Sequence, residues 1–316
     1  MLLKKNIPIG YLLKTIKWEI LFISVYTIVI GSLFYFLEQN NDPLPEIPIA
    51  VPMVMGTVIS LLLGFRSSQA YDRWWEARQV WGAIVNDSRS TVRQLISFTV
   101  GVNDPELQEF KREYTFRQAA WCQALGRSLR GRDPMKYLHS VLSVEDYEYV
   151  GRYVNVPNAI LELQGRAIGH ALQKGWINVY QQGNMDEILS RFCDEMGKCE
   201  RIKNTIFPST YSIYIHLALN FFLMLLPFSL FGVFNLFEIP MVILIAAMFL
   251  LIEKMAIYLQ DPFENKPTDT PVSTIANNIQ RDLQQMINDD ASFVAGHPPM
   301  ELPDYPYYKG KPYYQL

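Results

Sequence analysis

Residues 61–78, LLLGFRSSQAYDRWWEAR, indicate the architecture of the chain, because an apolar run there passes directly into charged residues. The apolar part belongs to the segment 47–64, which approaches the roughly 20 apolar residues that a helix needs to cross a bilayer. Two prolines at the start of this segment are tolerated, since the first turn of a helix has N–H groups without partners anyway. We predict a membrane helix that begins near Val51 and continues through Arg66 into the cytoplasm.

Three further segments of similar character predict four membrane helices in all: 18–37, 212–234 and 239–259. The first is too long for the apolar core of a signal peptide, so we expect it to be retained. The links 38–46 and 235–238 contain no Lys or Arg, whereas basic residues flank the other ends of the segments. By the positive-inside rule, both termini and the middle of the chain face the cytoplasm.

The region between the second and third membrane segments is polar and has apolar residues at helical spacing in 112–129 and 160–172. Turn signals at 131–134 and 155–157 separate its helices. A further helix is expected at 272–287, with Thr270 and Pro271 as cap and first turn. The proline- and tyrosine-rich tail 298–316 has no core of its own, and its rings could hold it along a neighbouring subunit.

We therefore expect four parts of the chain. Residues 1–80 hold the N-terminal segment and two membrane helices, and 81–209 form a cytoplasmic helical domain. Residues 210–260 form the other two membrane helices, and 261–316 a cytoplasmic helix and tail.

Composition excludes several classes of function. A formal net charge of −3 argues against a nucleic-acid partner, which needs a concentrated basic surface. The three cysteines lack the spacing of a metal site or a disulfide framework, so we expect reduced thiols. The four histidines are scattered, and no catalytic motif is present. We expect no metal and no cofactor, and an enzyme is the weaker interpretation.

The second membrane segment carries two stripes of residues at a spacing of four, which places each stripe on one helix face. The first stripe consists of Thr57, Leu61 and Phe65, and the second of the small residues Gly56, Ser60 and Gly64. Small residues let helices approach closely in lipid. The pattern suits a ring of identical helices around a narrow apolar pore that gates by dewetting. Packing of all six residues against the chain's own helices is the alternative.

Several motifs resemble those of the bestrophin family. Residues 61–78 are similar to its pore-helix signature, with Gly64, Phe65 and Arg73 at typical positions. The stretch 199–211, CERIKNTIFPSTY, resembles the entry to the third membrane helix of bacterial members. The triplet 261–263, DPF, resembles a family element, and Asp269 and Pro271 match the acid and proline that follow it.

This resemblance implies an all-α membrane protein that forms a homopentamer, with a transmembrane neck and a second, cytoplasmic aperture. It assigns the neck to Thr57, Leu61 and Phe65, and the aperture to Ile177 and Tyr180 within GWINVYQ. Tyr180 could instead be an aromatic of the core or of a subunit contact.

The sequence departs from the family pattern at two places. Thr57 puts a hydroxyl into a neck that is usually apolar throughout, which predicts easier wetting and a leakier pore. The stretch 264–269, ENKPTD, has two acids and an intruding lysine where animal members have consecutive acids that bind Ca²⁺. We therefore expect no gating by calcium.

The resulting hypothesis is a passive channel for small inorganic ions in the cell inner membrane. Anions such as chloride are favoured by the resemblance to the family. A monovalent-cation channel is the rival, because Asp42 and Glu46 in the outer link would concentrate cations. A membrane-anchored scaffold that conducts nothing is the alternative from another class.

Overall fold

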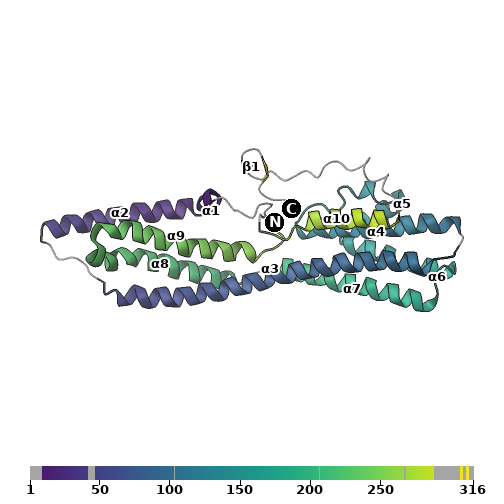
Figure 1. Ribbon diagram of the computed structural model, residues 1–316, viewed down its shortest axis with the longest axis horizontal. Coiled ribbons are helices and arrows are strands. Elements are labelled where there is room, and N and C mark those ends of the chain that lie inside the picture. Colours follow the sequence, from purple (N-terminus) through teal and green to yellow (C-terminus); the bar gives the residue numbers. More distant parts are fainter. Residues whose placement is uncertain are drawn as a thin grey trace. The chain divides into compact units, whose positions relative to one another are not determined.

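The structure is a computed structural model that describes residues 9–41, 47–102, 104–205, 207–266 and 268–287, with the backbone of 307–308 and 311–312. Nearly all of these residues lie in helices, so the predicted all-α class is confirmed (Figure 1). They form two compact units: the apolar unit, 9–74 and 207–261, and the polar unit, 75–205 and 262–287. The predictions for Asp42, Glu46 and most of the tail lie outside the described residues. In the tail, β1 (Tyr307–Tyr308) pairs antiparallel with β2 (Lys311–Pro312).

The apolar unit contains α1 (Ile9–Thr15), α2 (Lys17–Gln39), the first part of α3 (Ala50–Phe98), α8 (Ser209–Phe234), the 3-10 turn η2 (Asn235–Phe237) and α9 (Glu238–Leu259). Among the described residues, three helical stretches are long and apolar enough to cross a membrane: α2, α3 and 209–259. The last of these contains α8 and α9, which are joined by η2 and pack against each other (Figure 1). The predicted segments 18–37, 212–234 and 239–259 match α2, α8 and α9, and the predicted segment 47–64 covers only the start of α3, which continues to Phe98.

Apolar side chains and close contacts hold the apolar unit together. Ile59 and Leu63 of α3 share a buried core with residues of α8 and α9, including Phe222. Helix α2 packs against α9 and α8, and Phe34 makes edge-on ring contacts with Phe228 and Phe231, at centroid distances of 5.4 and 5.3 Å. Such edge-to-face pairs add to the gain from burial.

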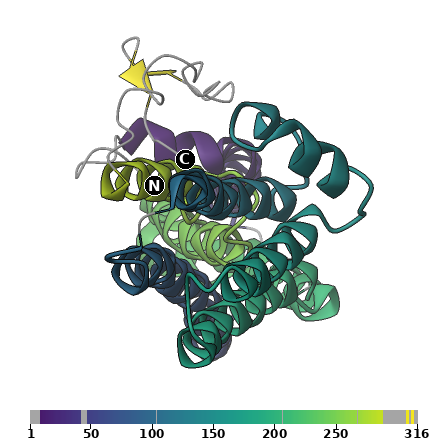
Figure 2. The same ribbon diagram turned by 90° about the vertical axis from the view of Figure 1, so that its right-hand side faces the viewer.

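The polar unit is a bundle of helices, seen nearly end-on in Figure 2. It contains the rest of α3, α4 (Pro105–Leu129), η1 (Leu138–Ser140), α5 (Val144–Val150), α6 (Val156–Gln173), α7 (Val179–Asn204) and α10 (Val272–Met286). Helix α4 packs against α6, α7 and α10. The core includes Trp121 and Phe192, with ring centroids 4.8 Å apart, and the buried thiols of Cys122 and Cys199.

Local sequence signals explain where most of these helices begin. The Asp104 side chain accepts a hydrogen bond from the Glu106 N–H at the start of α4, and Asn178 forms a capping box at the start of α7. The predicted cap of α10 is wrong by one residue: Pro271 is the N-cap, without a side-chain bond. Thr270 is held in the preceding turn, because its N–H donates to the Pro262 carbonyl and its own carbonyl accepts from the Val272 N–H.

Candidate pore-lining site

Helix α3 presents two opposite faces in the apolar unit. Its buried residues recur at 59, 63, 66 and 70, a helical spacing, and this face packs into the unit's own core. Leu61 and Phe65 are 59% and 57% exposed, and Thr57 is also exposed. At about 100° per residue, these three residues lie roughly opposite the buried face. The three predicted neck residues therefore share a face that points away from the chain's own core.

Only part of the small-residue stripe of α3 makes a close contact with another helix of the chain. A Cβ at Gly56 would lie 3.3 Å from the buried Phe222 ring of α8, so this glycine permits a close helix contact. A Cβ at Gly64 would have no described atom within 4 Å, and Ser60 is exposed. Packing of all six residues against the chain's own helices is therefore excluded.

The hydroxyl of Thr57 is engaged with its own helix. Its Oγ1 donates to the Met53 carbonyl oxygen at 2.9 Å, a bond that Thr often makes within a helix. The proton is therefore turned toward the backbone, and only the oxygen lone pairs remain to interact with water. This geometry limits, but does not remove, the expected polarity of the ring that Thr57 would form.

A buried arginine follows Phe65 directly. The side chain of Arg66 is 2% exposed, and its Nη2 donates to Ser212 Oγ at 3.0 Å. Its Nη1 lies 3.9 Å from Glu253 Oε1, and that carboxylate is also 2% exposed. Glu253 in turn contacts His216 Nδ1 at 3.0 Å. The network joins α3 to α8 and α9 next to a predicted neck residue.

From the sequence, Arg66 indicated only the orientation of the chain, and its partners in this network were not predicted. The available signal was Glu253, an acid within the apolar helix α9. Ionisable groups in apolar membrane helices are rare because they are costly to bury, and they usually have a partner. Through these contacts, Arg66 positions α3 against α8 and α9.

The structure separates the two predicted aperture residues. Tyr180 is 86% exposed in the first turn of α7, beside the exposed Val179. Ile177 is only 4% exposed and belongs to the core of the polar unit, which contradicts its assignment to the aperture. The physical reason is the capping box: Asn178 starts α7 in extended conformation, so Ile177 before it turns inward and Tyr180 after it stays outside.

The two acids of the stretch 264–269 lie in different surroundings. Glu264 contacts Lys203 Nζ at 2.5 Å. Asp269 is 1% exposed, and burial raises its pKa to about 6 although Lys266 and Arg130 act in the opposite direction. The described residues contain no cluster of three or more His, Cys, Asp or Glu side chains that would hold a metal ion.

A buried carboxyl group links α7 to α3 in the polar unit. Glu195 is 5% exposed, and burial, with a smaller contribution from Asp87, raises its pKa to about 8. Asp87 is held by Arg191 through two bonds of 3.0 Å each. Glu195 is therefore largely protonated at neutral pH, in contrast to an ordinary glutamate.

The long apolar helices, the buried ion pair among them and the apolar face that α3 leaves uncovered define a polytopic membrane protein. The profile of the family described as "Bacterial/Fungal Bestrophin protein" matches residues 6–285, and the chain belongs to this family.

Known relatives cover most of the chain. A protein of Nostoc sp. named as a voltage-dependent anion channel-forming protein is 29% identical over 258 residues, 81% of this chain and 83% of that one. YneE of Escherichia coli K12 bears the same description and is 30% identical over 242 residues, 77% of each chain. A crystal structure of a bacterial bestrophin homologue from Klebsiella pneumoniae has a TM-score of 0.79 at 28% identity, covering 86% of this chain and 98% of that chain.

Proposed function

We propose that the chain is one subunit of a homopentameric channel in the cell inner membrane that passively conducts small inorganic ions, with anions such as chloride favoured. Helices α2, α8, α9 and the first part of α3 cross the bilayer, and both termini are cytoplasmic. The four-part division into 1–80, 81–209, 210–260 and 261–316 remains part of this proposal. The names of the Nostoc and Escherichia coli relatives support anion conduction. We infer no enzymatic activity.

The observation that carries the proposal is the exposure of Leu61 and Phe65 on the face of α3 opposite its own core. The helices of the apolar unit pack on a shared core of buried apolar side chains, so we place the pore among several copies and not within one. Five copies of α3 with these side chains turned inward would form apolar rings, which gate by dewetting. Thr57 completes the neck, and Tyr180 would form the cytoplasmic aperture.

Two other functions remain as alternatives. A monovalent-cation channel would have the same neck, because uncharged rings do not select the sign of an ion and the field comes from charges elsewhere. A membrane-anchored scaffold would not conduct, and truncation of Phe65 would then have no functional effect.

Current measurements on purified protein in liposomes, in asymmetric NaCl, separate these functions. A current whose reversal potential follows the chloride gradient supports the proposal, a potential that follows sodium supports the cation channel, and no current supports the scaffold. Phe65→Ala should increase the open probability or leak, because it removes the bulk of an apolar ring. Phe22→Ala on α2 is the matched control, because Phe22 is 59% exposed and Phe65 57%. Equal effects of both variants would contradict the neck assignment.

We further propose that calcium does not gate this channel. Glu264 forms an ion pair with Lys203, and Asp269 is buried. The stretch 264–269 therefore offers few carboxylate oxygens to a hard cation. Currents should be the same in Ca²⁺ and in EGTA, and a steep dependence on Ca²⁺ would contradict this part of the proposal.

A further inference from the structure

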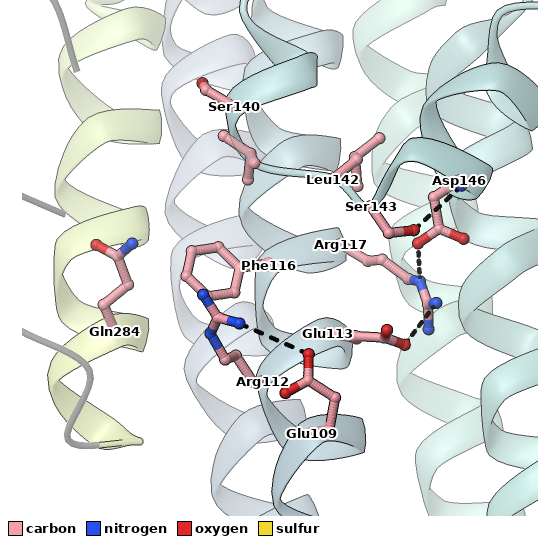
Figure 3. Close-up of a pocket in the computed structure, with 11 residues that line it drawn as sticks. Glu109, Arg112, Glu113, Phe116, Arg117, Ser140, Leu142, Ser143, Asp146 and Gln284 are labelled. Carbon is pink, nitrogen blue, oxygen red and sulfur yellow. Dashed lines mark hydrogen bonds and ion pairs between the residues drawn. The ribbon is translucent and has the colours of Figure 1, made fainter. Parts of the chain in front are cut away.

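The polar unit contains a cavity of about 260 Å³ between α4, the segment 140–146 and α10. Figure 3 shows Gln284 on one side of it and Arg117 with its acidic partners on the other. The wall includes two arginines, three acids, an amide and the apolar side chains of Phe116, Val141 and Leu142. Pockets for drug-sized ligands are roughly 300–1,000 Å³, so this one suits a smaller molecule.

Gln284 is the unusual member of the wall. It is 2% exposed, and neither its Nε2 nor its Oε1 has a hydrogen-bond partner among the residues that the structure describes. Most buried amides have partners, because a buried polar group without one is costly. The side chain offers both a donor and an acceptor at one point, so a molecule with groups of both kinds would satisfy it.

The charges of the wall are of both signs and differ in how firmly they are paired. Arg117 donates to Asp146 at 2.6 Å and to Glu113 at 3.0 Å, and its side chain is 12% exposed. Arg112 lies 3.6 Å from Glu109, beyond hydrogen-bond distance, and these side chains are 50% and 62% exposed. The Arg112 guanidinium lies 5.3 Å from the centre of the Phe116 ring. Exposed pairs of this kind are weak, so Glu109 can turn to a ligand at little cost.

We propose that this cavity binds a small zwitterion of the amino-acid class. The ligand carboxylate would accept hydrogen bonds from the Gln284 amide N–H₂ and from Arg112. The ligand ammonium would donate to the Gln284 amide oxygen and to Glu109 or Glu113. An aliphatic side chain would lie against Val141 and Leu142. A simple anion or cation would use only half of this arrangement. Binding here does not depend on whether the chain conducts ions.

Three probes that share one skeleton test the proposal on the purified full-length protein in detergent by isothermal titration calorimetry. L-valine carries both charges, 3-methylbutanoate lacks the ammonium, and isobutylamine lacks the carboxylate. We expect L-valine to bind at least about tenfold more tightly than either control, since each loses about two hydrogen bonds. No heat with L-valine at millimolar concentration, or equal affinity for all three probes, would overturn the proposal.

Variants of α10 link the binding to the cavity. Gln284→Leu should weaken L-valine binding at least about tenfold while keeping the fold, because an apolar side chain of similar size replaces a buried amide without partners. Gln285→Leu, at the exposed neighbouring position, is the matched control and should bind as the parent does. Arg112→Leu should weaken L-valine but not isobutylamine. Unchanged L-valine binding in Gln284→Leu and Arg112→Leu would overturn the assignment to this cavity.

Discussion

The loss of stability on breaking the buried ion pair beside the predicted neck can be estimated from the structure. Arg66→Met removes one charge from a pair in which both side chains are 2% exposed. Arg73 and Asp261 lie at the same separation of 3.9 Å, but their side chains are 15% and 34% exposed. The two pairs thus share charge type and distance and differ in their access to solvent, so Arg73→Met is the matched control.

The expected losses of stability differ between the two variants. Two unit charges at this separation interact by about 4 kcal/mol at an effective dielectric constant of about 20. Removal of one partner of a buried pair typically costs about 3–5 kcal/mol, because the other charge stays buried without compensation. His216 remains bonded to Glu253, which favours the lower end of that range. A pair with solvent access contributes about 0–1 kcal/mol.

Thermal unfolding of the purified protein, followed by tryptophan fluorescence at one detergent and salt concentration, measures the difference. At about 2–4 °C per kcal/mol for a chain of 150–250 residues, Arg66→Met should lower Tm by on the order of 10 °C and Arg73→Met by a few degrees at most. The double variant Arg66→Met with Glu253→Gln should be more stable than Arg66→Met alone, because no charge is stranded. Equal shifts for the two single variants, or a double variant no better than Arg66→Met, would refute the reasoning.

Four other substitutions have expected outcomes. Thr57→Ile should lower single-channel conductance, because an apolar ring resists wetting; an unchanged or larger conductance would count against a polar contribution from this position. Glu195→Gln should flatten the pH dependence of Tm. The pKa of Glu195 is raised from its ordinary value of 4.5 to about 8 in the folded state. The contribution of this group to stability is therefore fully present below pH 4.5 and is lost as the pH rises toward 8. The parent should therefore lose stability relative to the variant over that interval, and parallel profiles would contradict the assignment. Gly56→Ala should lower Tm, because its Cβ would meet the Phe222 ring at 3.3 Å. Gly64→Ala, where a Cβ meets no described atom within 4 Å, should raise the stability of the subunit by up to about 1 kcal/mol through helix propensity. The reverse order of stability would contradict the packing described for α3.

The sequence predicted the helices better than the side-chain contacts, and the reason is physical. Apolar runs of bilayer length leave few alternatives to a helix, so α2, α8 and α9 follow from composition. The exposed face of α3 follows from periodicity, because residues four apart share a side. Periodicity could not predict which of Ile177 and Tyr180 is buried, because they flank the irregular start of α7. There the direction of each side chain depends on the backbone conformation of the N-cap Asn178. The contacts of Arg66 depend on partners more than a hundred residues away, which no local pattern reveals.

The structure bears on what the outer face of α3 meets. Small residues such as Ser60 and Gly64 favour close contact between helices in a membrane, a benefit that a helix facing only lipid would not use. Gly56 meets Phe222 inside the subunit, but Ser60 and Gly64 border the exposed arc of Leu61 and Phe65. Ser60 is exposed, and a Cβ at Gly64 would have no described atom within 4 Å. Small residues next to large apolar ones suit a neighbouring helix on one side and a common axis on the other. In the proposed homopentamer, contact between copies of α3 at Ser60 and Gly64 would turn Phe65 toward the common axis. Gly64→Leu should then release subunits from that oligomer in light-scattering measurements, whereas a leucine at a lipid-facing position should not.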